Sequence, residues 1–415
     1  MKIKDKIFYG WVIVAAALVI FCVHSGIRFS FGVFFKSLQG EFDLTRAATS
    51  GVFSAYMGLS AVFGIISGWA VDRYGPRLVV GVMGVFMGLS LLITSQVNSF
   101  WQLFLSYSLL LAVGTGGILP VMISTVSRWF EKKRGIALGI ATSGSGLGVL
   151  VVAPFAAYLI TNFSWRISYI VIGLIAWLLI ISMSMLLRRD PGEIGLLPDR
   201  GNLNAGTKLS DRDENTQLTG LSLPQALRTR NFWLILSIWL LFGACVSLIL
   251  THVVPYATDI GVSFIEAATI LSVISGFNIL SRLLVGRISD TIGRKIPGIV
   301  CAMLGIGALV GLIWSHNLLM FYLFAIAFGF YFGGLGVSSL AMASDFFRGP
   351  SLGKIMGVLE VGFVTGSAIG SVLGGYIFDV TDSYIVAFVI GAVAILVTGL
   401  FVSLMGERQV PDTDW

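Results

Sequence analysis

An arginine within a long apolar run is the residue of this sequence best suited to do chemistry. Arg282 follows Asn278 by four positions, so a helix places both side chains on one face. A planar guanidinium grips a carboxylate through two parallel hydrogen bonds, which no neutral side chain matches. Snorkelling to a membrane surface, or a salt bridge between helices, would also account for it. Because charged residues within apolar spans are costly and functional by default, we expect Arg282 to bind an organic anion and Asn278 to orient it.

Arg28 is a second basic residue within an apolar run, the first run of the chain. Its place toward the end of that run leaves two roles open, snorkelling to the outer headgroups and binding of the anion. With Arg282 as the only cation, a second carboxylate on the ligand stays unpaired, and a buried unpaired charge is costly. The sequence therefore predicts a preference for singly charged anions, which Arg28 would reverse by turning inward.

Three titratable side chains in or beside apolar runs are candidates for carrying a proton. His252 and Asp259 are seven residues apart, so they can share a helix face, and histidine titrates near physiological pH. Glu360 is expensive if it is ionised and unpaired in an apolar span. The alternatives are a histidine satisfied inside the bundle, and a Glu360 that pairs with Lys354 or Arg348.

Other side chains offer little chemistry. Tyr331 is the aromatic residue we select, because its phenol can bond a carboxylate. The three cysteines lie in separate apolar runs, without the spacing of a metal site or a disulfide framework. The sequence has no HExxH, paired-histidine or GxSxG motif, so we expect neither an enzyme nor a bound metal or cofactor.

The composition of the chain indicates which structural elements position these residues. Hydrophobic residues make up 56% of the chain and charged residues 12%, which is far outside the range of water-soluble domains. Each membrane span takes roughly 20 apolar residues, so the 415 residues have room for about a dozen helices. The sequence therefore predicts an all-α polytopic membrane protein, for which the lipid bilayer is the solvent.

Charge gives the orientation. With a cytoplasmic N-terminus, most of the 27 Lys and Arg residues fall on alternate loops, as the positive-inside rule requires. The net charge of +6 is then a topology signal and implies no nucleic-acid partner. The apolar run that follows the basic start continues to Phe35 without a small-residue cleavage site, so we expect an uncleaved first span. We expect a monomer in a cell (inner) membrane, with both termini cytoplasmic.

Twelve apolar runs are bounded by charged or turn residues. They lie at about 9–35, 47–71, 78–96, 101–127, 135–160, 168–187, 232–256, 264–288, 296–314, 318–344, 353–378 and 384–405. A polar stretch rich in charge separates the first six from the last six, and Ser222 and Gln225 near its end have capping-box spacing. These features predict an N-terminal six-helix bundle (1–190), a cytoplasmic linker with a short interfacial helix (191–230) and a C-terminal six-helix bundle (231–415).

An internal repeat supports the two bundles. A shift of 218 positions carries Gly68, Asp72 and Gly75 onto Gly286, Asp290 and Gly293. The same shift superposes four glycines of the fifth run, at 135, 139, 144 and 148, on glycines of the eleventh run. A parallel repeat of six spans is the architecture of a two-domain carrier whose site lies between the halves.

The repeated loops, GWAVDRYGPR and GRISDTIGRK, look like the signature loop of the major facilitator superfamily. We interpret them as gating loops, since small residues allow helices to approach and the charges hold the turn at the headgroups. The alternative is a turn with no role beyond topology. The residues assigned to the gate are Asp72, Arg73, Arg77, Asp290 and Arg294.

More motifs narrow the resemblance. YGW (9–11), FGVFFKSLQGEF (31–42), RWFEKKRGIALGIATSGSGLG (128–148) and DPGEIGLLPD (190–199) resemble the monocarboxylate transporter family and its bacterial oxalate/formate antiporter relatives. That resemblance implies the major facilitator fold and an arginine at Arg282 that binds a substrate carboxylate. It implies a lysine at Phe29, next to Arg28, and an aspartate at Asn278 that helps proton coupling. Asparagine cannot carry that proton.

These observations predict a secondary active transporter that works by alternating access and moves a monocarboxylate of the lactate or pyruvate type with a proton. The alternatives are anion exchange of the oxalate/formate type, and a membrane nutrient sensor that transports nothing. Fold alone does not decide between them.

Overall fold

The computed structural model describes residues 8–130, 133–195, 221–347 and 352–405, and within these ranges the secondary structure is helical, with no strand. The first group of elements consists of α1 (Tyr9–Phe29), α2 (Phe31–Glu41), α3 (Arg46–Tyr74), α4 (Pro76–Thr94), α5 (Phe100–Leu103), the π-helix η1 (Phe104–Leu110), α6 (Leu111–Thr115), α7 (Ile118–Trp129), α8 (Arg134–Asn162) and α9 (Trp165–Leu186). The second consists of the 3-10 helix η2 (Pro191–Ile194), α10 (Leu223–Ala226), α11 (Arg230–Asp259), α12 (Phe264–Ile292), α13 (Lys295–Ile313), α14 (Leu318–Phe346), α15 (Leu352–Thr381) and α16 (Ile385–Leu404).

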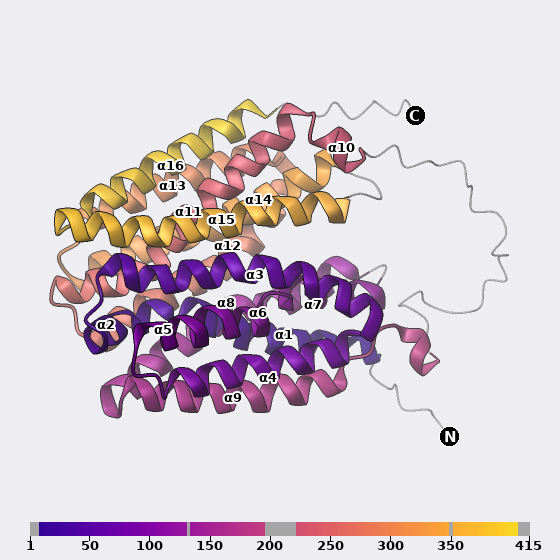
Figure 1. The fold of residues 1–415 in the computed structure, drawn as a ribbon. Coiled ribbons are helices and arrows are strands. Elements are labelled where there is room, and N and C mark those ends of the chain that lie inside the picture. The colour runs from indigo at the N-terminus through magenta and orange to yellow at the C-terminus, as the bar shows by residue number, and fades with distance from the viewer. Residues whose placement is uncertain (1–7, 131–132, 196–220, 348–351, 406–415) are drawn as a thin grey trace, which may run out of the picture. The chain divides into compact units, whose positions relative to one another are not determined.

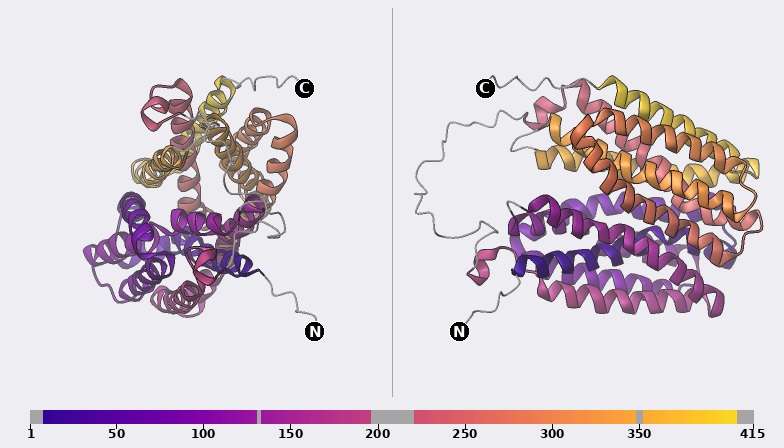
Figure 2. Two further views of the ribbon diagram at one scale, coloured as in Figure 1. Left: turned by 90° about the vertical axis from the view of Figure 1, so that its right-hand side faces the viewer. Right: turned by 180° about the vertical axis from the view of Figure 1, so that it is seen from behind.

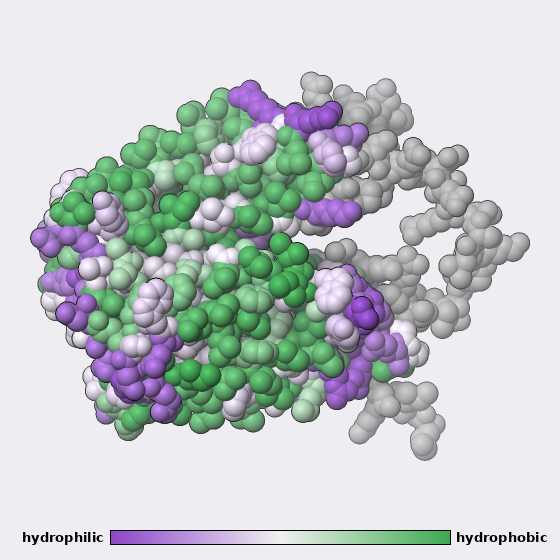
Figure 3. Space-filling model, in the orientation of Figure 1, coloured by the Kyte–Doolittle hydropathy of each residue, from purple (hydrophilic) through white to green (hydrophobic). Residues whose placement is uncertain are grey.

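Twelve helical stretches among the described residues are long and apolar enough to cross a membrane, as the sequence predicts. The first is Tyr9–Glu41, because α2 continues α1 after a break at Ser30 and extends the span beyond its predicted end at Phe35. Figure 3 shows hydrophobic side chains along α3, α4 and α9 and hydrophilic ones at the ends of these helices. A bilayer stabilises this pattern, since each backbone polar group within such a helix is bonded internally.

The helices form two compact units. The first comprises Met1–Thr207, Leu250–Gly276 and Ser371–Asp382, and the second comprises Lys208–Ile249, Phe277–Gly370 and Ser383–Trp415. Within the first unit α1 packs along α8 and α4 along α9, as Figures 1 and 2 show. Within the second unit α13 packs against α14 and α16. The division into bundles 1–190 and 231–415 stays a prediction, and linker residues 196–220 lie outside the described ranges.

Local sequence signals set several helix starts. Thr45 and Asn317 cap α3 and α14 by accepting hydrogen bonds from the N–H groups of Ala48 and Met320, at 3.1 and 3.0 Å. The predicted short helix near the end of the linker is α10, and Ser222 and Gln225 form the expected capping box. In it the backbone N–H of Ser222 donates to the Gln225 side chain at 2.9 Å.

The 218-residue repeat extends to backbone conformation. Gly75 and Gly293, which it superposes, have φ values of +79° and +87°, in the region that favours glycine. Each lies at the end of a long helix, in the loop before the next one, so the two sharp turns require the same residue for the same reason.

Close helix packing repeats as well, at two of the glycine pairs that the 218-residue shift superposes. A Cβ on Gly144 or Gly148 of α8 would collide with α1 backbone, at Leu18 and Cys22 respectively. The equivalent glycines of α15 face α11: a Cβ on Gly366 would collide with the Leu240 backbone, and one on Gly362 with the Leu236 side chain. Gly135, Gly139 and Gly357 have no neighbour within 4 Å of a Cβ, so the close packing does not extend to these positions.

We expect Gly148→Val to destabilise the first unit, because the added side chain must push α8 away from α1. Overpacking of this kind costs about 1–3 kcal/mol. The apparent melting temperature of the purified protein in detergent checks it, with Gly139→Val as the control on the same helix. Equal melting temperatures for the two variants would contradict close packing at Gly148.

Candidate functional site

Arg282 and Asn278 lie on α12 in the second unit, one turn apart. Asn278 is 4% exposed and its amide nitrogen has no hydrogen-bond partner. The buried Nε of Arg282 has none either. Among the described residues no carboxylate lies within 4.0 Å of the Arg282 guanidinium, so the salt-bridge alternative has no support here. Unpaired donors in a buried setting are what an anion would satisfy.

The helix α14 positions this part of α12. A Cβ on Gly333 would collide with the backbone of Asn278, so glycine allows the two helices to touch there. Next to this contact, the Ser281 hydroxyl donates to the backbone oxygen of Phe330 at 2.7 Å. These contacts fix the height and rotation of the helix turn that carries Arg282.

Tyr331 is on α14 and is fully buried. Its ring packs edge-on against Phe242, with ring centroids 5.7 Å apart, and against the backbone of Gly305 on α13. Its hydroxyl lies near the weakly polar Cys245 thiol and makes no hydrogen bond to an oxygen or nitrogen atom. It is therefore a third polar group of the second unit without a strong partner.

Arg28 lies in the first unit and is not at the end of its span. Thirteen residues of the 33-residue span follow it, and its Nη2 donates to the Met57 sulfur of α3 at 3.2 Å. The guanidinium also lies near the Phe29 ring, 5.1 Å from Cζ to the ring centroid, and among the described residues it has no carboxylate partner. Thioether sulfur is a weak acceptor. Moving a cation out of water costs several kcal/mol of solvation free energy. Partners as weak as these recover only a small part of that cost.

Sequence reasoning missed His24, one turn before Arg28. It is 6% exposed and its Nδ1 is buried with no hydrogen-bond partner. Arg28 is close enough to act electrostatically on both His24 and Tyr56. The signal available in the sequence was the spacing of four between His24 and Arg28, which places them on one helix face.

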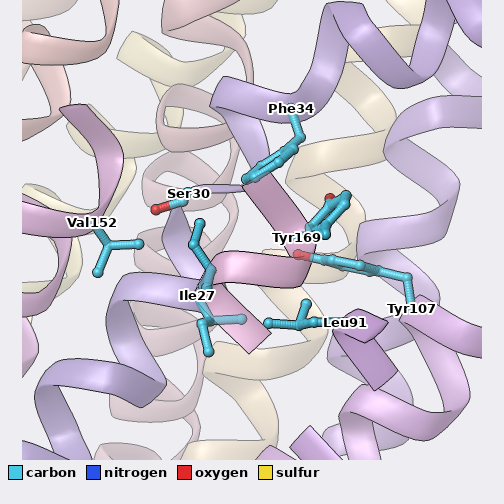
Figure 4. Close-up of a pocket in the computed structure, with 8 residues that line it drawn as sticks. Ile27, Ser30, Phe34, Leu91, Tyr107, Val152 and Tyr169 are labelled. Atoms are coloured by element: carbon cyan, nitrogen blue, oxygen red, sulfur yellow. The ribbon is translucent and has the colours of Figure 1, made fainter. Parts of the chain in front are cut away.

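A small pocket lies on another side of α1. Figure 4 shows Phe34 above Tyr169, with Tyr107 beside it. The Tyr169 hydroxyl, which lines this pocket, is buried and has no hydrogen-bond partner. Tyr107 belongs to η1, and π-helical turns often occur at functional sites.

Four charged residues form an ion cluster where α2 meets α3 in the first unit: Lys36, Arg46, Asp259 and Asp379. Asp259, the last residue of α11, pairs with Lys36 at 2.6 Å and with Arg46 at 2.7 Å. Asp379 of α15 accepts from the N–H groups of Arg46 and Ala47, at 2.9 and 2.7 Å. A carboxylate there offsets the partial positive charge of the α3 N-terminus. The cluster ties the consecutive helices α2 and α3 to the ends of α11 and α15, which are distant in sequence.

His252 is fully buried near this cluster, on α11. Its Nε2 lies 2.8 Å from the Ser371 carbonyl oxygen and 3.3 Å from the Ser50 hydroxyl. Because a carbonyl oxygen only accepts, Nε2 carries the proton in this arrangement. This is the bonding expected of a histidine satisfied within the bundle. Its role as a proton carrier stays a prediction, as do those of Asp259 and of the part-buried Glu360 on α15.

We expect Asp259→Asn to lower stability, because Lys36 and Arg46 lose a shared carboxylate. Hydrogen bonds to charged groups contribute about 1.5–3 kcal/mol each, and the partial exposure of Lys36 and Asp259 reduces that figure. Asp43→Asn, at an exposed carboxylate nearby with no ion pair among the described residues, is the control. Thermal unfolding checks the prediction, and an unchanged melting temperature for Asp259→Asn would mean that the cluster holds nothing together.

The gating residues differ in their contacts. Asp72 pairs with Arg128 at 3.3 Å, while Arg73 lies over the Trp69 and Tyr74 rings and Arg77 is exposed. In the repeated loop, Arg294 pairs with Asp345 at 3.4 Å, and the Asp290 side chain lies outside what the structure describes. Each loop thus makes an ion pair, through Asp72 in the first and through Arg294 in the second, and the repeat does not superpose these two residues. Their gating role stays a prediction.

The motif YGW has a structural role. Tyr9 donates to the backbone oxygen of Leu186 at 2.9 Å, and the Tyr9 ring packs on Trp129. A Cβ on Gly10 would collide with the Phe8 and Phe130 rings. This motif and RWF at 128–130 therefore pack against one another at one end of the first unit.

Comparison with known proteins places these features in a family. The family model described as Major Facilitator Superfamily matches residues 17–335 and 283–414. The chain is 25% identical over 409 residues to monocarboxylate transporter 2 of Mus musculus, covering 95% of this chain and 83% of that protein. It is 27% identical over 407 residues to monocarboxylate transporter 13 of Bos taurus, covering 95% and 89%.

Solved structures agree on the fold. A bacterial homolog of the human lysosomal transporter Spinster, inward-facing and occupied, superposes with a TM-score of 0.74 at 16% identity, covering 97% of each chain. The nucleoside transporter NupG gives a TM-score of 0.74 at 12% identity, covering 96% of this chain and all of the other. At these identities the likeness establishes the fold alone.

Proposed function

This chain belongs to the Major Facilitator Superfamily, as a multi-pass membrane transporter, and we propose that it moves small monocarboxylates together with protons. The names of its relatives support the substrate class. The observation that carries the proposal is Arg282, a guanidinium within an apolar span that has no carboxylate partner among the described residues. Such a cation is costly unless an anion joins it.

In the proposed mechanism Arg282 anchors the substrate carboxylate. Two parallel N–H donors match the two carboxylate oxygens, and Asn278 adds an amide donor one turn away. Tyr331 is placed by Phe242 and Gly305 and contributes a phenol to the same unit. Alternating access then exposes the loaded site to each side of the membrane in turn. The loops with Asp72 and Arg294 serve as gates.

The proton needs its own carrier, since Asn278 cannot titrate. His252, Asp259 and Glu360 are the proposed candidates. Protonation of one of them, or of the substrate itself, would let an inward proton gradient drive uptake.

Anion exchange of the oxalate/formate type is the second candidate. One observation favours it: asparagine stands at position 278, where the resemblance to proton-coupled animal transporters implies an aspartate. An exchanger needs no proton carrier, because the returning anion resets the site.

Purified protein in proteoliposomes tests the proposal with labelled pyruvate, lactate, formate and oxalate, each with and without a pH gradient. We expect pyruvate and lactate to enter, and a gradient to increase their uptake. Uptake that ignores the gradient and requires internal anion would establish exchange. No flux of any carboxylate would refute the proposal.

A further inference from the structure

Arg28 presents one whole edge of its guanidinium without an adequate partner. Nε and Nη2 lie on the same edge, where their two N–H bonds run parallel and fit the two oxygens of a carboxylate. Nε is buried and has no partner, while Nη2 has only the Met57 sulfur, 3.2 Å away. Among the described residues no carboxylate, carbonyl or hydroxyl oxygen bonds to this edge.

A second buried group without a partner lies on the same helix face. His24 is one turn before Arg28, and its Nδ1 makes no hydrogen bond. Neutral imidazole offers either a donor or an acceptor at that atom. The Tyr56 ring and the Met57 thioether of α3 lie on the Arg28 side and are almost completely buried. These groups leave a cationic centre with apolar and weakly polar walls.

The neighbourhood does not explain the arginine as a packing element. A structural arginine is normally held by carboxylates or carbonyl oxygens, as Arg166 at the start of α9 is held by Glu41 and by the backbone oxygens of Ser95 and Val97 in this unit. Arg28 has a sulfur atom and the Phe29 ring in their place.

We propose that the first unit has its own anion-binding site, in which the Nε and Nη2 edge of Arg28 grips a small carboxylate and His24 bonds to it. The site is formed by residues of the first unit and stands apart from the claim that Arg282 anchors the transported substrate. Arg28 would then be a second cation that binds an anion, which is one of the two roles that the sequence left open for it.

The test uses the full-length protein purified in detergent, with sodium pyruvate as the probe and sodium chloride at equal ionic strength as the reference. Wild type and Arg282→Gln are titrated while the apparent melting temperature is recorded. We expect pyruvate to stabilise Arg282→Gln as well, because the Arg28 site remains. In the double variant that carries Arg28→Gln as well as Arg282→Gln, the half-saturating pyruvate concentration should rise roughly tenfold to a hundredfold. Arg28→Lys should also weaken it, since the charge stays but the parallel donors are lost.

A second readout separates binding from packing. Removing a cation that has no partner raises stability without ligand, whereas removing a structural cation lowers it. Arg28→Gln should therefore melt higher than wild type in chloride and respond little to pyruvate. Arg230→Gln, an exposed arginine at the start of α11, is the control and should change neither property.

Two results would overturn the site. One is a pyruvate response that Arg282→Gln abolishes and Arg28→Gln leaves intact. The other is a loss of stability in chloride for both Arg28→Gln and Arg28→Lys. Neither result depends on flux, so failure of the transport proposal in vesicles is distinguishable from failure of this one.

Discussion

Arg282→Gln is expected to reduce carboxylate uptake into proteoliposomes by roughly a hundredfold or more, because it removes both charge-assisted hydrogen bonds of the anchor. Uptake by Arg282→Lys is expected to fall nearly as far. Lysine keeps the positive charge, but its ammonium is a point charge that cannot form two parallel bonds to one carboxylate. Initial rates over a range of pyruvate concentrations measure both effects.

The control for this prediction is Arg230→Gln, which removes an exposed arginine from α11 and should transport at the wild-type rate. Insertion is checked by melting temperature and by elution from a size-exclusion column. A correctly folded Arg282→Gln protein with wild-type uptake would show that the anchor is elsewhere.

An inward proton gradient is expected to drive uphill accumulation of pyruvate. One pH unit is a tenfold ratio of proton concentration, so coupling of one proton to one anion supports about tenfold accumulation. His252→Gln, Asp259→Asn and Glu360→Gln are then compared one at a time. The variant that still exchanges pyruvate but no longer accumulates it identifies the proton carrier.

His252 and Asp259 carry bonds that also hold helices together, so their variants need a second measurement. Exchange of labelled for unlabelled pyruvate supplies it, since exchange needs the folded carrier but no net proton movement. Accumulation that survives in all three variants would exclude these residues as the carrier.

Much of the fold follows from local properties of the chain. Twelve spans are predicted by hydropathy alone, because the bilayer demands about 20 apolar residues for each helix. The repeat predicted equal roles for equivalent glycines, and the pairs at 144 and 362 and at 148 and 366 fulfil that expectation. Gly139 and Gly357, a further equivalent pair, are also alike, but neither has a neighbour within 4 Å of a Cβ. Which equivalent glycines face a neighbouring helix is a tertiary property that no local pattern encodes.

The site was less predictable, and the reasons are physical. Arg282 was selected as the candidate anchor because a charge in an apolar span is conspicuous in sequence, and its role in binding stays a prediction. The contacts of Arg28 could not be predicted, because a long side chain on a helix reaches either the headgroups or a neighbouring helix. Only the position of Met57 in the fold decides between the two. The ion cluster joins residues more than 200 positions apart, so composition gave no indication that Asp259 pairs with Lys36 and Arg46.

Counterflow tests the central claim most directly. Proteoliposomes loaded with unlabelled pyruvate are diluted into a trace of labelled pyruvate, with no pH gradient. A carrier that works by alternating access returns loaded, so the label should rise to a transient overshoot well above its equilibrium level. Saturable binding of pyruvate without any overshoot, in vesicles whose protein is folded, would contradict transport and identify a membrane sensor instead.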